Sequence, residues 1–166
     1  MSRHPASSKT GYHLSTLPSG TGLVLKPMPQ AQSVSIGMWA RAGGRYEQPE
    51  RAGISHFLEH MLFKGTHRRS CETLKRQIEG VGGSLNGFTA EEFTCYTVKA
   101  PARSAQLAMK VLADMLLHSK LAESDVEKER EVILEEIRMY EDSPGQAIHD
   151  FFNELINGIY LRYSGF

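Results

Sequence analysis

The feature that most restricts the fold is the segment at residues 52–63, which has the length and periodicity of a helix. At about 100° per residue, His56, Glu59 and His60 fall on one side of this helix. Two histidines four positions apart lie one turn above each other, so both can reach one metal ion, and Glu59 can accept a proton from water beside it. The opposite side is apolar: Ile54, Phe57, Leu58, Met61 and Leu62. Because ionisable groups on so apolar a helix need a partner, we predict a metal site rather than a chance grouping.

A third ligand is expected from a second amphipathic helix, predicted at residues 124–140. Most of its acids share a charged face, but Glu129 and Glu136 fall within the apolar arc. Carboxylates in a buried stripe require an explanation. We predict that Glu136, and not its neighbour Glu135, is the third ligand. We also predict that Glu129 supports the site by contacting one of the ligands rather than the metal. The alternative is that the two acids pair with Arg130 or another buried cation.

The remaining pattern interleaves short strands with helices and ends in a helical run. We predict strands over residues 13–17, 21–25, 33–40, 84–89 and 93–99, and helices over 52–63, 72–79, 102–118, 124–140 and 146–156. Ser124 and Glu127 have the spacing of a capping box, and the lone Trp39 is expected in the core. This order predicts an α+β fold, a mostly antiparallel sheet with helices packed on one face.

Composition excludes several classes of protein. The net charge is zero, without a long basic run, so we expect no nucleic-acid partner. Apolar stretches are too short for a membrane span, and we expect no membrane. The two cysteines, Cys71 and Cys95, fit a reducing compartment. We therefore expect a cytoplasmic protein. The alternative is the mitochondrial matrix, because the first twenty residues contain Arg3 and Lys9 but no acidic residue, as in a transit peptide.

Three motifs in this order are similar to those of a known family. Residues 56–66, HFLEHMLFKGT, resemble the signature of the M16 peptidases, the family of pitrilysin and insulin-degrading enzyme. Residues 129–136, EREVILEE, resemble that family's second motif, and residues 82–89, GGSLNGFT, resemble the stretch between them. The similarity runs over residues 12–154, which is most of the chain.

The resemblance implies a zinc-dependent endopeptidase with a fold similar to that of the LuxS/MPP-like metallohydrolases. One zinc ion per chain would be held by His56, His60 and Glu136. Glu59 would be the catalytic base and Glu129 a supporting acid of the site. A peptide substrate would add as a strand beside the edge formed by Asn86, Gly87 and Phe88, with Phe63 in the adjoining pocket. Gly87 stands where the family usually has alanine, which should loosen this edge slightly.

The resemblance also implies a larger working unit. Family members consist of two homologous halves that close around the peptide, and we expect a homologous second domain or subunit as a partner. We predict a disordered lead-in at residues 1–11, the front portion of a peptidase domain at 12–155 and an atypical tail at 156–166. Such a chain should bind metal but have weak or no peptidase activity alone. The alternatives are a non-catalytic peptide-binding or assembly subunit and a truncated gene product.

Overall fold

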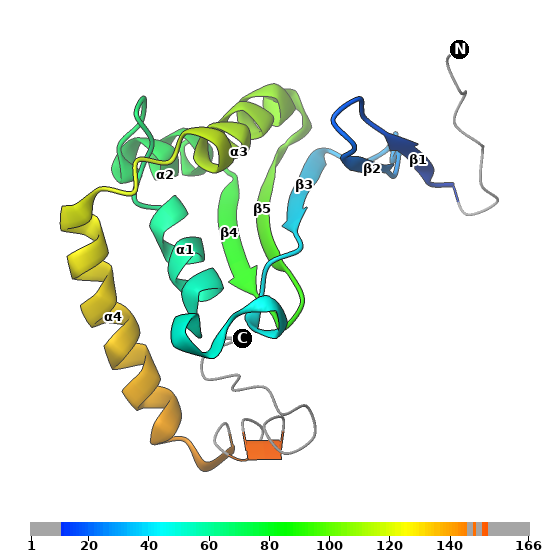
Figure 1. The fold of residues 1–166 in the computed structure, drawn as a ribbon. Helices are drawn as coiled ribbons and strands as arrows, with labels where there is room; N and C mark the ends of the chain where they lie inside the picture. The colour runs from blue at the N-terminus through cyan, green and yellow to red at the C-terminus, as the bar shows by residue number, and fades with distance from the viewer. Residues whose placement is uncertain (1–10, 146–147, 149–150, 153–166) are drawn as a thin grey trace. The chain divides into compact units, whose positions relative to one another are not determined.

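The computed structural model describes residues 11–145, 148 and 151–152, which belong to two compact units divided after Gln32 (Figure 1). The first unit contains a hairpin of β1 (His13–Thr16) and β2 (Gly22–Leu25), which pair antiparallel. Gly20 has a φ of 86° in the connecting turn, a conformation that glycine adopts without strain. Both predicted opening strands are therefore confirmed, each one residue shorter.

The second unit contains a three-stranded antiparallel sheet in the order β3-β5-β4. Its strands are β3 (Ser33–Ala40), β4 (Ser84–Thr89) and β5 (Thr94–Pro101). The first two have the predicted bounds, and β5 begins one residue later than predicted and runs two residues further. In the register, Ile36 lies opposite Val98, which lies opposite Leu85, so these three apolar side chains share one face.

In the described part of the chain, four named α-helices accompany this sheet. They are α1 (Ile54–Leu62), α2 (Cys71–Glu79), α3 (Ala105–His118) and α4 (Glu123–Glu141). Short 3₁₀ turns cover Gly44–Tyr46, Pro49–Arg51 and Ala102–Ser104, so the first turn of the helix predicted at residues 102–118 is 3₁₀ rather than α. The helix predicted at residues 146–156 lies largely outside the described residues.

The predicted capping box at the start of α4 is wrong. The N-cap is Ala122, and no side chain caps the helix there. The backbone N–H groups of Asp125 and Val126 donate to the carbonyl of Ala122, so the helix starts one residue earlier than predicted. Ser124 consequently lies inside the first turn, where it cannot be the N-cap.

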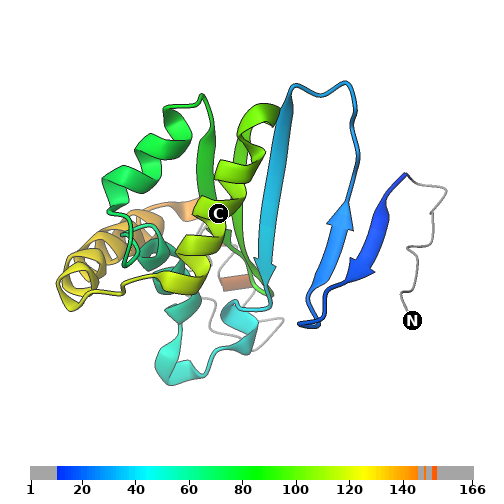
Figure 2. The ribbon, with the colours of Figure 1, turned by 90° about the horizontal axis from the view of Figure 1, so that it is seen from above.

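The hydrophobic core lies between one face of the sheet and the helices. Val98 and Ala100 of β5 are buried against the apolar side of α3, which lies against β3 and β5 (Figure 2). The buried residues of this cluster are Leu74, Ile78, Tyr96, Val98, Ala100, Ala108, Val111, Leu112 and Met115. The predicted α+β arrangement, with helices on one face of an antiparallel sheet, is confirmed. The expectation for Trp39 is wrong: strand alternation places it on the other face, 63% exposed and 4.8 Å from the Phe93 ring.

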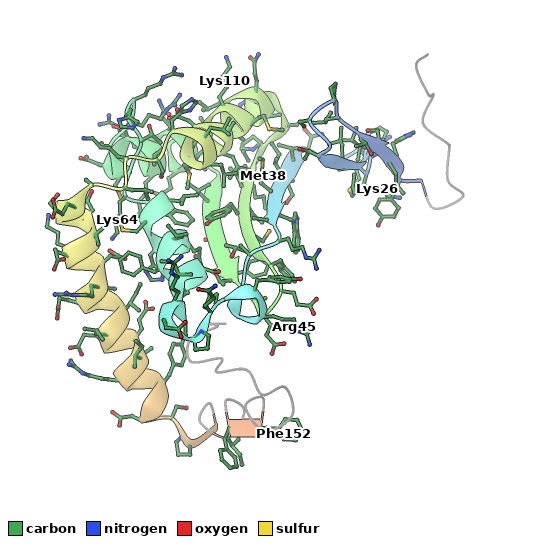
Figure 3. The ribbon with its side chains drawn as sticks, in the orientation of Figure 1. Lys26, Met38, Arg45, Lys64, Lys110 and Phe152 are labelled. Atoms are coloured by element: carbon green, nitrogen blue, oxygen red, sulfur yellow. The ribbon has the colours of Figure 1, made fainter. Side chains whose placement is uncertain are left out.

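Helix α1 contacts β4 on one side and α4 on another (Figure 1). Its buried residues include His56 and Glu59, whereas the apolar Ile54 and Leu58 are exposed. His56 and Glu59 are therefore turned inward together with Met61: Glu59 contacts Thr89 at the end of β4, and His56 lies near Glu136 of α4. Figure 3 shows Lys64, just beyond the end of α1, beside the start of α4. Among the described helices, none is long and apolar enough to cross a membrane.

Candidate metal centre

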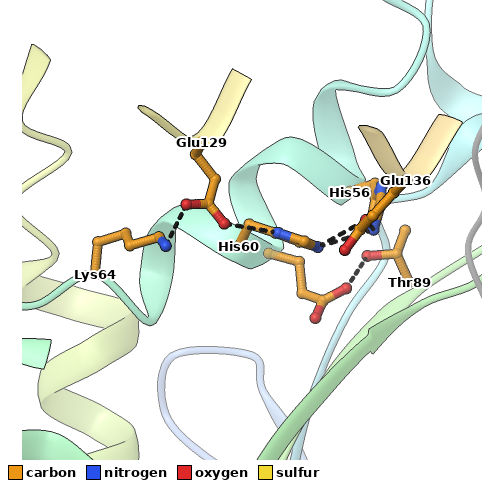
Figure 4. Close-up of polar contacts among 7 residues, drawn as sticks. His56, His60, Lys64, Thr89, Glu129 and Glu136 are labelled. Carbon is orange, nitrogen blue, oxygen red and sulfur yellow. Dashed lines mark hydrogen bonds and ion pairs between the residues drawn. The ribbon is translucent and has the colours of Figure 1, made fainter. Parts of the chain in front are cut away.

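Three potential ligand atoms converge between α1 and α4 (Figure 4). The Nε2 atoms of His56 and His60 are 3.1 Å apart. The Oε2 atom of Glu136 lies 3.8 Å from Nε2 of His56 and 3.7 Å from Nε2 of His60. Each of the three residues thus offers one atom to a common point, all within 4.8 Å of one another.

This spacing fits a tetrahedral metal ion. Zinc bonds to nitrogen and oxygen of about 2.0–2.2 Å place tetrahedral ligand atoms about 3.3–3.6 Å apart. Two imidazoles and one carboxylate are also a donor set of catalytic zinc sites, which keep a fourth position open. The side chain of Glu136 is 34% exposed, whereas that of Glu135 is 72% exposed and paired with Arg138. The fold thus brings Glu136, and not Glu135, to the two histidines.

Glu129 lies behind His60, on the side away from the other two ligand atoms. Its Oε1 atom is 2.9 Å from Nδ1 of His60, and its Oε2 atom forms an ion pair with Lys64. Burial raises the pKa of Glu129, but hydrogen bonds and charges from Lys64 and His60 outweigh this and lower it overall. A carboxylate in this place accepts the Nδ1 proton of His60 and leaves Nε2 free to bind metal.

Both interpretations of Glu129 drawn from the sequence therefore have a counterpart in the structure. The residue touches a candidate ligand, and it also pairs with a cation. That cation is Lys64 rather than Arg130, which forms ion pairs with the exposed Glu127 and Glu131.

Glu59 is buried on the sheet side of α1. The hydroxyl of Thr89, at the end of β4, donates a hydrogen bond of 3.0 Å to its Oε2 atom. Burial raises the pKa of Glu59, partly opposed by Thr89 and His60 and supported by Glu136. A carboxylate with a raised pKa beside a metal-ligand cluster is suited to accept and return a proton.

The side chain of His56 is more buried than that of His60. Burial and the neighbouring His60 lower the pKa of His56 to about 4, although Glu47 acts in the opposite direction. Its Nδ1 atom has no hydrogen-bond partner among the described residues. The imidazole is therefore neutral near pH 7, which is the form that binds a metal ion.

The residues predicted to bind substrate lie on β4 and at the end of α1. β4 is a terminal strand of the sheet in its described part; Asn86 and Phe88 are exposed, and Phe63 is half-buried. A Cβ atom on Gly87 would lie 2.8 Å from Oε1 of Glu59 and 2.9 Å from Cε2 of Phe63. Gly87 is therefore in direct contact with the candidate base.

Three residues beside the site were missed by the sequence analysis: Lys64, Thr89 and Glu47. Lys64 follows His60 by four positions, so its place on the same side of the helix was a usable signal. Thr89 shares a strand face with Gly87, but only the packing of α1 on β4 makes that face important. No local pattern marks Glu47, because it contacts the start of α1 across a loop.

Comparisons with known proteins found similar chains. The chain is 44% identical over 143 residues to the uncharacterized zinc protease YmxG of Bacillus subtilis, covering 86% of this chain and 35% of that protein. It is 39% identical over 137 residues to a probable mitochondrial-processing peptidase subunit beta of Arabidopsis thaliana, covering 82% of this chain and 26% of that one. The chain thus spans about a third or less of the length of these relatives.

A solved structure has the same fold. The crystal structure of a protease from Helicobacter pylori matches with a TM-score of 0.82 and 25% identity, over 86% of this chain and 35% of that one. The family model described as insulinase (peptidase family M16) matches residues 23–158, which include all the candidate ligands. The chain therefore belongs to the insulinase family of peptidases, family M16.

Proposed function

We propose that this chain carries the metal centre of a zinc-dependent endopeptidase, with His56, His60 and Glu136 as ligands of one zinc ion. The observation that carries the proposal is the convergence of their three ligand atoms beside the buried carboxylate of Glu59. Several relatives are named as zinc proteases, which supports the choice of metal.

The roles of the other residues follow from their contacts. Zinc, when bound, supplies a Lewis acid that polarises a peptide carbonyl and makes water more acidic. Glu59 would accept a proton from water at the site and return it to the leaving amine, and the hydroxyl of Thr89 holds its carboxylate in place. Glu129 fixes the ring orientation of His60 and keeps its Nε2 unprotonated.

The proposed substrate is an extended peptide that pairs with the backbone of β4 at Asn86 to Phe88. A terminal strand offers unpaired N–H and C=O groups, to which a peptide can add as another strand. Gly87 lies at the centre of this segment and contacts Glu59, so a paired peptide passes close to the base. Phe63 would contact a side chain of that peptide.

The chain alone is proposed to cleave peptides weakly or not at all. The chain matches only about a third of the length of its relatives, and the remainder of such a protein would close over the substrate. Without that wall, a bound peptide is poorly oriented and water is not excluded, and orientation supplies a large part of catalysis. A homologous second domain or subunit is the partner that would complete the site.

Zinc content tests the proposed ligands directly. The purified chain should hold about one zinc per molecule by elemental analysis. Glu136→Gln should lose it, whereas Glu135→Gln, a matched change at the exposed neighbour, should keep it. A folded wild-type chain without zinc, or equal loss in both variants, would contradict the ligand set.

A second measurement tests the base. Residual cleavage of a quenched fluorescent peptide should fall by about 100-fold or more in Glu59→Gln, or below detection, while zinc content stays unchanged. Cleavage at ordinary enzyme rates by the isolated chain would contradict the proposed need for a second half. Cleavage that persists in Glu59→Gln would contradict the role of Glu59.

A further inference from the structure

The start of α1 has no cap of its own. Its N-cap residue, Gly53, has a φ of 88° and no side chain, and its first turn contains no acidic residue. The first N–H groups of a helix have no partners within the helix and need acceptors from elsewhere. His56 lies in this first turn, so any movement of the helix start moves a candidate metal ligand.

Glu47 supplies the missing acceptors from six residues upstream of Gly53. Its Oε2 atom accepts the backbone N–H of Gly53 at 2.6 Å, and its Oε1 atom accepts that of Ser55 at 2.8 Å. A carboxylate that binds two N–H groups at a helix start is held in both position and orientation. The residue after Ser55 is His56, and Glu47 lies close enough for its charge to act on that imidazole.

The loop that carries Glu47 is itself fixed to the end of the sheet. Gly43 packs so tightly that an added Cβ would lie 2.3 Å from the carbonyl oxygen of Ala90, in the turn after β4. The N–H of Arg45 donates to the carbonyl of Glu91 in the same turn, at 2.9 Å. Glu47 therefore ties the first turn of α1 to the strand end that also holds Glu59 through Thr89.

We propose that Glu47 is a positioning residue of the metal centre, which sets the place of His56 by fixing the first turn of α1 against the sheet. This inference rests on the proposed zinc site. At the other end of α1, Glu129 is held by an ion pair with Lys64 and in turn holds His60 by a hydrogen bond. Glu47 has the corresponding role for His56 at the start of the helix.

The test compares zinc affinity with stability in the full chain. Zinc dissociation constants would be measured with a competing chromophoric chelator for wild type, Glu47→Ala, Glu47→Gln and Glu50→Gln. Glu47→Ala should bind zinc about 10- to 100-fold more weakly, the range for residues that orient a metal ligand. Glu47→Gln keeps one oxygen acceptor and should fall between Glu47→Ala and wild type. Glu50, an exposed acid in the same loop, is the matched control and should leave the affinity unchanged.

Two readouts separate positioning from a merely structural role. The visible spectrum of the cobalt-substituted protein should change in Glu47→Gln, because the coordination geometry changes with His56. If Glu47→Ala and Glu47→Gln lower only the unfolding temperature of the metal-free protein, with wild-type zinc affinity and cobalt spectrum, the inference is overturned. A folded wild-type chain without zinc would instead refute the proposed function, and this inference with it.

Discussion

The two sides of His60 hold two buried glutamates that differ in their partners. On the sheet side, Glu59 has the neutral hydroxyl of Thr89, and burial raises its pKa. On the α4 side, Glu129 has the ammonium group of Lys64 as well as His60, and these outweigh burial and lower its pKa. Burial by itself therefore does not decide the role of a carboxylate. The charge of its nearest partner decides whether it is suited to exchange a proton or to remain ionised.

The same contrast explains how one site can combine a fixed histidine with a carboxylate that is suited to exchange a proton. The α4 side orients the candidate ligand His60 with a carboxylate that should stay ionised near neutral pH. The sheet side keeps a carboxylate that is only lightly held, by one hydroxyl, next to the strand edge where a peptide would lie. Changes on the α4 side should therefore affect the free energy of unfolding and its pH dependence. Changes on the sheet side should instead affect the pKa of Glu59.

The largest effect is expected from Lys64→Met, which leaves Glu129 buried without its cation. We expect a loss of about 1–3 kcal/mol in the free energy of unfolding of the metal-free protein at pH 7, because an ionised carboxylate is left poorly partnered. The folded-state pKa of Glu129 is lowered, so its ionised form stabilises the protein above the ordinary glutamate pKa, and this is lost as pH falls through the lowered value. The difference between variant and wild type should accordingly shrink toward acid pH.

Urea unfolding from pH 7 down to about pH 3 measures this difference. Lys128→Met changes an exposed lysine on α4 and is the matched control, expected to have little effect at any pH. A loss that is the same at neutral and acid pH would mean that Lys64 acts by packing, and the contrast between the two glutamates would fail.

Most of the fold could be predicted from the sequence because its signals are local. Strand alternation at residues 33–40 and 84–89 gave the observed bounds, and the periodicity of α4 separated Glu136 from Glu135. The ligand set itself stays a prediction until metal is measured. The sequence failed where the answer depends on packing: Trp39 is 63% exposed on the face of the sheet opposite the helices, where its ring contacts those of Phe88 and Phe93.

The residues that surround the site were harder to predict from the sequence than its candidate ligands. Lys64 and Thr89 reach the two glutamates only because α1 lies between α4 and β4, an arrangement that periodicity does not specify. Glu47 acts across a loop, and its two acceptor contacts have no sequence signature. Candidate ligands that are spaced along one helix can be predicted from the sequence. The residues that orient them belong to other elements, and only the structure identifies them.

A smaller and more selective effect is expected at Asp114, a buried carboxylate on α3 that is not part of the candidate metal cluster. Burial raises its pKa, but hydrogen bonds from Thr66 and Arg69 and the charges of Arg69 and His118 lower it overall. The hydroxyl of Thr66 donates at 2.7 Å and the guanidinium of Arg69 at 2.5 Å. Asp114→Asn should cost about 1–2 kcal/mol of stability at pH 7 and leave zinc affinity unchanged.

The pH dependence has the same sign as for Glu129. Because the folded-state pKa of Asp114 is lowered, its contribution is present above the ordinary aspartate pKa and is lost as pH falls through the lowered value. Urea unfolding across this range, with the exposed Asp142→Asn as control, measures it. Weaker zinc binding in Asp114→Asn would show that the metal centre depends on charge in the core as well as on its own two sides.

The smallest effect is expected on the sheet side, from Gly87→Ala. The added methyl group would lie 2.8 Å from Oε1 of Glu59 and 2.9 Å from the Phe63 ring, so both side chains must shift slightly. All these contacts are with side chains rather than backbone, and Gly87 does not have a left-handed φ, so stability should change by less than about 1 kcal/mol. The methyl group removes further solvent from Glu59, and the pKa of this carboxyl in the metal-free protein should rise further.

Carbon-detected NMR titration of the Glu59 carboxyl group would measure this rise, and Gly37→Ala provides the control. An added Cβ at Gly37 would be equally crowded, 2.9 Å from Nε1 of Trp39, but on the opposite face of the sheet. It should leave Glu59 unchanged. Zinc affinity should stay at its wild-type value in both variants, because neither touches Glu129 or the ligands. If Gly87→Ala instead weakened zinc binding, the sheet side would also hold the candidate ligands, and the two glutamates could not have separate roles.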